Sequence, residues 1–333
     1  MNIKDIARLA GVGVSTVSRV INNHPDVKQD TREKILEIIK EYNYIPNNGA
    51  RMLKQNHTRY IGVLVKGVFN PFFSEMVKII GEVIKKSDYT MILQHDDKEE
   101  GEDIDSLISF IKEKKLKGVM YLGGNFAEVP KERFEQIDCQ IVALCSNIGD
   151  NINNAFFSSV GIDDYRAAYE AMTYVINKGH RHIGMLIGGK NDVGVGKERL
   201  RGYLDAIQDF EIDKSQTYII EGHYNCTEAY EKTLSCLEEV GELTAIAALS
   251  DTMAVGAAKA ILKQDKQIGK DIDVIGFDGM EIAAYYHPSL TTIEQPRADI
   301  AAKGVELLLE LLAKTCQHQH CILKTNLLKR ESC

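Results

Sequence analysis

The sequence has no tryptophan, only six prolines among 333 residues, and no run approaching the ~18 consecutive apolar residues that mark a membrane-spanning helix. It therefore predicts no membrane partner. The first residues, Met-Asn-Ile-Lys-Asp, lead directly into an amphipathic pattern rather than a signal peptide. We therefore expect a cytoplasmic protein.

The seven cysteines are odd in number and scattered, without a CxxC pair or a Cys/His metal spacing. This pattern indicates reduced thiols and predicts neither disulfides nor a metal site. The chain also lacks a GxSxG elbow, an HExxH motif and a Walker A loop, because Gly188-Gly189-Lys190 has neither the glycine spacing nor the hydroxyl residue of that loop. We expect no enzyme and no cofactor.

The net charge of −8 argues by itself against a nucleic-acid partner, but its distribution reverses that argument. Residues 1–59 hold ten Lys or Arg against six Asp or Glu, a net charge of +4, which leaves −12 for the remainder. A basic N-terminal unit joined to an acidic body is typical of a DNA reader attached to a sensor.

The first 42 residues predict three short helices. Apolar residues between 3 and 10 recur at spacings of three and four, and Gly11 then ends that helix, because glycine accepts a left-handed turn. A second helix follows and buries Val17 and Val20, and a third, over 30–42, closes the core. Two short helices around a glycine turn form a helix-turn-helix.

The second helix turns Ser15, Thr16, Ser18 and Arg19 outward. Small polar side chains on such a helix can enter a major groove and bond to base edges. The alternative is a helical bundle with Ser and Thr on a solvated face.

Three ordered runs, TVSRVIN, TREKILEIIKEYNYIPN and ARMLK, resemble the lactose and galactose repressor family of bacterial transcriptional regulators. The resemblance implies double-stranded DNA with a palindromic operator as one partner. It implies a set of DNA-contacting residues: Val14, Ser15, Thr16, Ser18, Arg19, Asn22, Tyr44, Asn47, Ala50, Arg51 and Leu53.

The segment after Pro46 is short and polar, so alone it is a weak helix. The resemblance gives it the role of a hinge helix, at about 47–55, that orders by pairing with its copy in the DNA minor groove. Leu53 is then a wedge at the central base step, and Ala50 lies at the helix–helix contact. The alternative is an ordinary linker in which Leu53 packs on the body.

Beyond Arg59, apolar strands alternate with helical patterns as far as Phe277. Repeated βα units with continuously apolar strands predict parallel sheets covered by helices on both faces. The units are too many for one sheet, so we expect an α/β body of two doubly wound subdomains with a ligand cleft at the carboxyl ends of the strands.

The resemblance implies a periplasmic-binding-protein-like body with chain crossovers near 161, 291 and 318. The expected domains are 1–58 for DNA binding and 59–333 for effector binding and dimerisation. The first subdomain then takes about 60–160 and 292–317, and the second about 161–290 and 318–330. Because the chain stops soon after Leu328 without leucine heptads, we expect a homodimer.

Side chains that follow the predicted strands are expected to line the cleft and to bind a small polyhydroxylated effector, a sugar. The candidates are Phe72, Phe73, Asn147, Arg199, Tyr224, Asp251 and Asp278. Two of them have a second interpretation, because Asp251 is also a candidate helix N-cap, which we favour, and Phe72 is also a candidate core residue.

One position departs from the family pattern. Cys145 stands where many relatives have an aspartate, and a thiol is a poor acceptor for a hydroxyl. We expect Asn147 to substitute for that aspartate or the ligand to take a different pose.

The sequence thus predicts a ligand-gated dimeric repressor that is not an enzyme. The alternatives are an activator or a corepressor-dependent regulator of the same family, and a cytosolic sugar-binding or carbohydrate-processing protein with an accessory DNA-binding head.

Overall fold

The computed structural model describes residues 1–21, 24–44, 59–67, 71–96, 102–149 and 156–333. The chain divides into two compact units, Met1–Thr58 and Arg59–Cys333, called here the N-terminal unit and the body. Within the described ranges, no helix is long and apolar enough to cross a membrane.

The N-terminal unit contains the predicted three helices, α1 (Ile3–Ala10), α2 (Val14–Ile21) and α3 (Gln29–Glu41). Asn2 caps α1 and exchanges hydrogen bonds with Asp5, which satisfies backbone donors at the helix start. Gly11 ends α1 in the left-handed conformation at φ 70°. Ile6, Val17, Val20 and Ile35 are buried together where the three helices meet.

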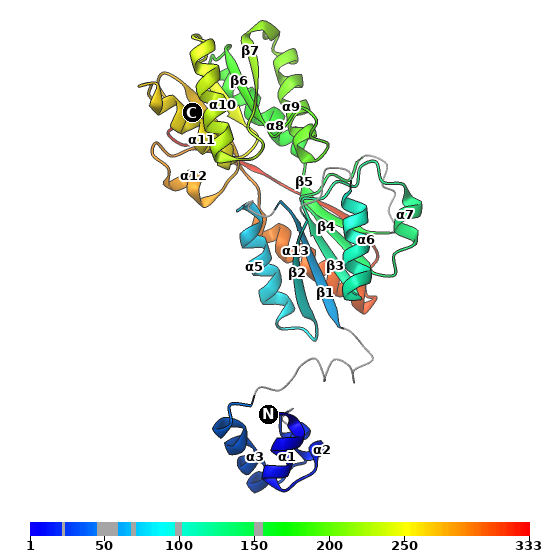
Figure 1. Ribbon diagram of the computed structural model, residues 1–333. Helices are drawn as coiled ribbons and strands as arrows, with labels where there is room; N and C mark the ends of the chain where they lie inside the picture. The colour runs from blue at the N-terminus through cyan, green and yellow to red at the C-terminus, as the bar shows by residue number, and fades with distance from the viewer. Residues whose placement is uncertain (22–23, 45–58, 68–70, 97–101, 150–155) are drawn as a thin grey trace. The chain divides into compact units, whose positions relative to one another are not determined.

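The first sheet of the body has the strand order β11-β5-β4-β3-β1-β2. Its strands are β1 (Tyr60–Lys66), β2 (Thr90–Asp96), β3 (Gly118–Leu122), β4 (Gln140–Leu144), β5 (Ser158–Ile162) and β11 (His320–Leu323), and all their pairings are parallel. One face packs on α5 (Phe72–Ile84) and α13 (Arg297–Ala313), and the other on α6 (Asp103–Lys114) and α7 (Lys131–Glu135). We call this layered unit the first subdomain (Figure 1).

The second sheet has the order β12-β10-β9-β8-β6-β7. Its strands are β6 (Ile183–Ile187), β7 (Thr217–Glu221), β8 (Ala245–Ala248), β9 (Asp273–Asp278), β10 (Thr291–Glu294) and β12 (Asn326–Leu328). The strands pair in parallel except β12, which runs antiparallel to β10.

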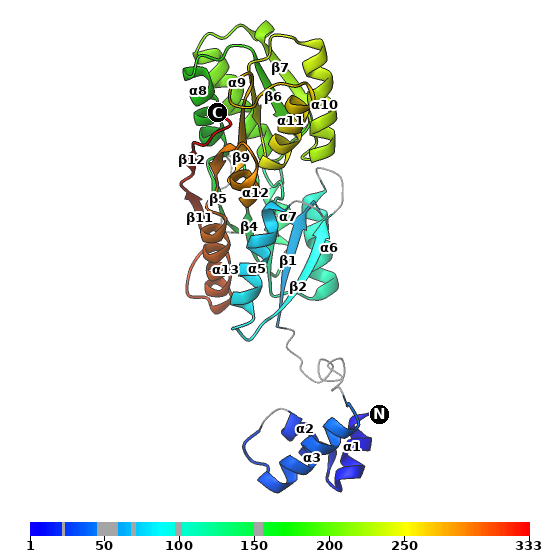
Figure 2. The ribbon, with the colours of Figure 1, turned by 90° about the vertical axis from the view of Figure 1, so that its left-hand side faces the viewer.

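Helices cover the second sheet on both faces. Figure 2 shows α8 (Asp164–Asn177) and α9 (Val195–Asp209) on one side, and α10 (Cys226–Glu239) and α11 (Asp251–Lys263) on the other. A 3-10 turn, Lys214–Gln216, precedes β7, and the short helix α12 (Glu281–Tyr285) follows β9. This second subdomain has one continuous apolar core, and the predicted α/β fold of two doubly wound sheets is confirmed.

The chain crosses between the subdomains after β5, after β10 and between β11 and β12. The last crossing differs from the expectation that 318–330 lies wholly in the second subdomain. Because β11 extends the first sheet beside β5, the crossing falls after Leu323 rather than near 318. In the same way β10 belongs to the second sheet, where it pairs with β9, so the return to the first subdomain follows Glu294.

Candidate effector cavity and DNA-binding surface

A cavity of about 510 Å³ lies between the two subdomains. The first subdomain contributes residues that follow β1, β3 and β4, and the second contributes residues that follow β6, β7, β8 and β9. This size is ordinary for a pocket that encloses a small organic ligand. The cavity therefore lies at the carboxyl ends of the strands, where the fold class binds ligands.

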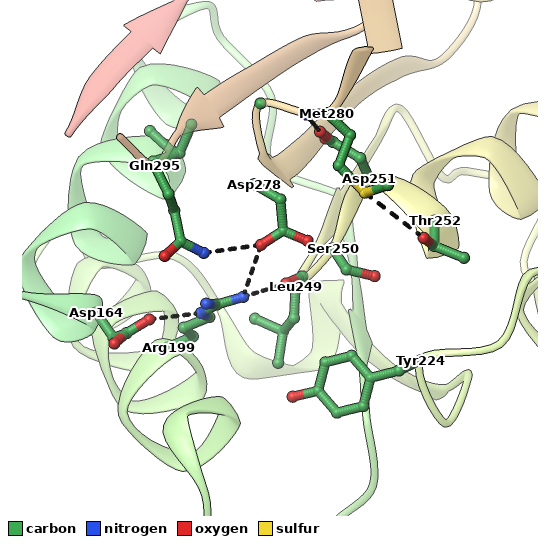
Figure 3. Close-up of polar contacts among 12 residues, drawn as sticks. Asp164, Arg199, Tyr224, Leu249, Ser250, Asp251, Thr252, Asp278, Met280 and Gln295 are labelled. Carbon is green, nitrogen blue, oxygen red and sulfur yellow. Dashed lines mark hydrogen bonds and ion pairs between the residues drawn. The ribbon is translucent and has the colours of Figure 1, made fainter. Parts of the chain in front are cut away.

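Arg199 and Asp278 form the polar floor of the cavity. The Arg199 Nε donates to Asp164 Oδ1 at 2.8 Å, and its Nη1 donates to the Leu249 carbonyl oxygen at 2.7 Å and approaches Asp278 Oδ1 at 3.4 Å (Figure 3). The guanidinium also lies 3.9 Å from the centre of the Phe277 ring. Arg199 is 5% exposed, so these contacts hold a buried cation in a fixed orientation.

Asp278 is held at the end of β9 in an unusual backbone conformation, with φ 118°. Its Oδ1 accepts hydrogen bonds from Gln295 Nε2 at 2.9 Å and from Arg199. Burial raises the pKa of Asp278 to about 6, against the opposing effect of the Arg199 charge. Backbone strain and a shifted pKa at one cavity residue are both typical of functional sites.

Aromatic rings form the walls. Phe72 and Phe73, at the start of α5, are both buried and line the cavity with their rings packed edge to face at 5.1 Å. Phe72 therefore lines the cavity and also belongs to the core of the first subdomain, and its contact with an effector stays a prediction. Tyr224 lines the other side, and its hydroxyl donates to Asp192 Oδ2 at 2.7 Å.

Tyr224 is positioned by its backbone and by two glycines. His223 and Tyr224 both have positive φ, 47° and 52°, in a turn that is held by the bond from the His223 N–H to the Gly188 carbonyl oxygen. A Cβ on Gly188 or on Gly196 would lie 2.2 Å from an atom of the Tyr224 side chain. The ring therefore occupies space that any other residue at those two positions would fill.

The structure places Asp251 outside the cavity lining and away from the N-cap position. The N-cap of α11 is Ser250, whose hydroxyl accepts from the Met253 N–H. Asp251 instead accepts from the Met280 N–H at 2.6 Å and from the Thr292 hydroxyl at 2.6 Å. The preferred cap interpretation is therefore wrong, since this fully buried carboxylate joins α11 to β10 and to the turn after β9.

Asn147 does not line the cavity either. Its Nδ2 donates to the Val193 carbonyl oxygen at 2.8 Å and lies 3.4 Å from the Gly194 oxygen, so it joins the first subdomain to the second. Cys145 does line the cavity. Burial raises the pKa of its thiol, so Cys145 contributes a neutral surface at the position where many relatives have an aspartate, and Asn147 does not take that aspartate's place in the lining.

Sequence reasoning missed several residues at the cavity. Lys66 and Asp103 line it as an ion pair at 3.0 Å, and Asp103 accepts from the Tyr121 hydroxyl at 2.5 Å. Asp192, in the loop after β6, was missed as well. The sequence signal was available for Lys66, which is the last residue of β1, and for Asp192, which lies in the loop after β6. Asp103 is the first residue of α6 and does not lie at a strand end.

In the N-terminal unit, α2 carries five of the residues that were predicted to contact DNA bases. Val14, Ser15 and Arg19 are exposed, and Thr16 and Ser18 are half-buried. Arg19 lies 3.2 Å from Asp26 in a surface ion pair. Tyr44 packs partly against the core of this unit, a position that the sequence did not reveal. The remaining candidates for DNA contact lie outside the described residues: Asn22, Asn47, Ala50, Arg51 and Leu53.

Comparison with known families finds two matching models. Residues 2–47 match the model described as bacterial regulatory proteins, lacI family. Residues 172–333 match a periplasmic binding protein-like domain.

Curated relatives match over nearly the whole chain. The chain is 51% identical to the HTH-type transcriptional regulator MalR of Clostridium butyricum, over 100% of this chain and 99% of that protein. It is 30% identical to catabolite control protein A of Priestia megaterium, over 94% and 93%, and 32% identical to the ribose operon repressor of Haemophilus influenzae, over 99% and 98%. All three are named as regulators of gene expression or of metabolism.

Among solved structures, a Lac repressor bound to ONPG in the repressed state superposes with a TM-score of 0.81 at 24% identity, over 100% of this chain and 99% of that one. This likeness extends over both the N-terminal unit and the body.

Proposed function

The chain belongs to the lacI family of bacterial regulatory proteins, and from this premise we propose that it is a cytoplasmic homodimeric repressor that binds a palindromic operator and responds to a neutral sugar in the cavity of its body. The observation that supports the ligand class most directly is the charge balance of that cavity. Lys66 contacts Asp103, and Arg199 contacts Asp164 and Asp278. Asp192 adds a further carboxylate.

This arrangement suits a ligand that donates hydrogen bonds and has no charge. Each cation of the described lining contacts a carboxylate, so a phosphate group would meet an excess of negative charge. The carboxylate of Asp278 can accept from ring hydroxyls, and Phe73 and Tyr224 can pack on the apolar face of a sugar ring. One relative, the ribose operon repressor, is named for a sugar.

DNA recognition is proposed for residues 1–58, with α2 in the major groove. A single α2 reads only one half-site of an operator. A homodimer has two copies of α2, and a palindromic operator offers each copy the same half-site. The hinge segment near 47–55 is proposed to pair with its copy in the minor groove.

The effector acts by favouring one arrangement of the two subdomains. Arg199 and Asp278 lie in the second subdomain and Phe73 in the first, so a ligand that touches all three draws the subdomains together. In such a dimer, closure of the two subdomains shifts the hinge segments of the two subunits relative to each other.

Two measurements test this function. Titration of operator fragments with the purified protein should show sequence preference and an affinity that falls steeply with salt. Thermal unfolding in the presence of a panel of sugars, sugar phosphates, nucleobases and amino acids should show stabilisation by a neutral sugar. Stabilisation only by a phosphorylated or cationic ligand would overturn the ligand class and leave the DNA-binding function in place.

A further inference from the structure

The loop between α2 and α3 folds back onto the helix that carries Arg19. The His24 N–H donates to the Arg19 carbonyl oxygen at 2.9 Å, and the His24 carbonyl oxygen accepts from the guanidinium of Arg32 on α3. Val27, further along the loop, packs against the apolar core of the N-terminal unit. These contacts hold the loop on both sides of Asp26, so the Asp26 side chain has a defined place beside α2.

Asp26 contacts two side chains at once. Its Oδ2 lies 3.2 Å from Arg19 Nη1, and its Oδ1 lies 2.9 Å from His24 Nδ1. Because an ionised carboxylate only accepts hydrogen bonds, His24 donates through Nδ1. Each carboxylate oxygen therefore has its own partner. Together with the backbone bond from His24 to Arg19, these two contacts close a ring that fixes the carboxylate against the guanidinium.

We propose that Asp26 is a positioning residue for base recognition, which holds the Arg19 guanidinium in the orientation that binds a guanine. This inference rests on the proposed function, because Arg19 is itself proposed to contact a base. It extends that function to a residue outside α2, and it assigns to Asp26 a contribution to specificity at one base pair rather than to general affinity for DNA.

The guanidinium of Arg19 can serve both contacts. It has five N–H donors in one rigid plane, and the contact with Asp26 is made through Nη1. A bidentate contact with guanine O6 and N7 therefore does not require the ion pair to break. The Arg19 side chain is 58% exposed, so without Asp26 it samples many rotamers, and fixing one of them on binding costs free energy. The preformed contact removes part of that cost for the base that this orientation fits.

The negative charge of Asp26 argues against a role in general affinity for DNA. A carboxylate beside α2 repels phosphates, and this repulsion acts on every DNA sequence alike. The ion pair is also exposed on both sides, so it contributes little to folding. The contribution of Asp26 is therefore expected in discrimination between bases.

The test determines base preference at each operator position, by binding-site selection and then by affinity measurements on single-base variants of the selected operator. Comparison of the full-length protein with its Arg19→Ala variant first identifies the position that Arg19 contacts. At that position, Asp26→Asn should lower the preference for the selected base by about two- to fivefold, as expected for the loss of one exposed ion pair. Preferences at the other positions should be unchanged, and affinity for non-specific DNA should not fall.

Asp30→Asn is the matched control. Asp30 lies in the first turn of α3, is exposed, and makes no ion pair among the described residues. Its substitution removes the same charge from the same unit and should leave every base preference unchanged. A second control combines Asp26→Asn with Arg19→Ala. In that background Asp26→Asn should change no preference, because a residue that acts through Arg19 has no effect without it.

Four results overturn the positioning role while the DNA-binding function survives. They are an unchanged preference in Asp26→Asn, an equal fall at all operator positions, the same fall in Asp30→Asn, and any change that Asp26→Asn causes in the Arg19→Ala background. If Arg19→Ala retains the wild-type motif, the proposed base contact of Arg19 fails, and the role of Asp26 fails with it.

Discussion

The side chain of Asn147 in the first subdomain donates a hydrogen bond of 2.8 Å to the Val193 carbonyl oxygen in the second. The acceptor precedes α9, the helix that carries Arg199 into the cavity. This bond therefore joins the two walls of the cavity directly and stabilises the arrangement of the two subdomains seen in this structure.

Removal of that bond should weaken effector binding. Asn147→Ala loses about 0.5–1.5 kcal/mol of the free energy that holds the subdomains in this arrangement, so the effector's Kd should rise by up to about tenfold. Asn147→Asp is the matched variant, because it keeps an acceptor for the Gly149 N–H but cannot donate to Val193. Calorimetry checks both variants, and unchanged affinity would remove Asn147 from the closure mechanism.

Arg199 should be essential for stability as well as for binding. Arg199→Ala leaves Asp164 and Asp278 buried without their cation, which should lower the free energy of unfolding by about 3–5 kcal/mol. Urea unfolding of the full chain measures this loss. Arg201→Ala, two residues along the same helix and exposed, should cost less than about 1 kcal/mol. Equal losses for the two variants would contradict the buried network.

Effector affinity should depend on pH through Asp278. The pKa of this carboxyl is raised to about 6 by burial, and a ligand that donates hydroxyls prefers the ionised form. Affinity should therefore be constant above about pH 7 and fall by as much as tenfold per unit below pH 6. Asp278→Asn should bind weakly with a flat profile between pH 5 and 8. A wild-type profile without this fall would exclude Asp278 as the acceptor.

The same raised pKa has an effect of opposite sign on stability in the absence of ligand. Between the ordinary aspartate value and about 6, the folded state binds more protons at Asp278 than the unfolded state does. The contribution of Asp278 to the free energy of unfolding therefore decreases as pH rises through that window. Comparison of wild type with Asp278→Asn between pH 4 and 7 isolates this contribution.

Arg19 should specify one base pair in each half-site. Its ion pair with Asp26 is exposed on both sides, so it contributes little to folding and leaves the guanidinium available to a guanine. Arg19→Ala should cost about 1–3 kcal/mol of discrimination at that position. Arg8→Ala, an exposed arginine on α1, is the control. If binding-site selection returns the same motif for Arg19→Ala as for the wild type, Arg19 contacts phosphate instead.

Leu53 lies outside the described residues, and its role stays a prediction from sequence. If it is the minor-groove wedge, Leu53→Ala should weaken operator binding and reduce DNA bending, while the effector affinity of the protein stays unchanged. Bending measured by fluorescence energy transfer between the ends of an operator fragment decides this. A variant that bends DNA as the wild type does would contradict the wedge.

The sequence predicted those parts of the fold that depend on local pattern. The three N-terminal helices and the alternating strands and helices of the body follow from apolar periodicity, and Gly11 marks its helix end because a positive φ favours glycine. Strands β10, β11 and β12 were not predicted, because each is short and includes polar residues, whereas the equally short β8 is wholly apolar. The third crossing was expected near 318 from the family resemblance, and the unpredicted β11 moves it past Leu323.

The candidate site was predictable where a residue follows a strand end, as Arg199 and Asp278 show. The role of a candidate residue was not predictable where that role depends on hydrogen-bond partners far away along the chain. The run Ser250-Asp251-Thr252 offers two capping side chains, and nothing local shows that Asp251 will bond to the Met280 N–H and to Thr292. Likewise, Asn147 meets a carbonyl group 46 residues away along the chain.

The three crossings between subdomains set the order in which the working parts of the protein can form during synthesis. The N-terminal unit is complete once Thr58 has left the ribosome, whereas the first sheet waits for β11, which ends at Leu323. At 5–20 residues per second, the roughly 260 intervening residues take about 13–50 s. During that interval the nascent chain carries the three folded N-terminal helices without a finished sensor, so α1, α2 and α3 can fold long before the ligand cavity is complete.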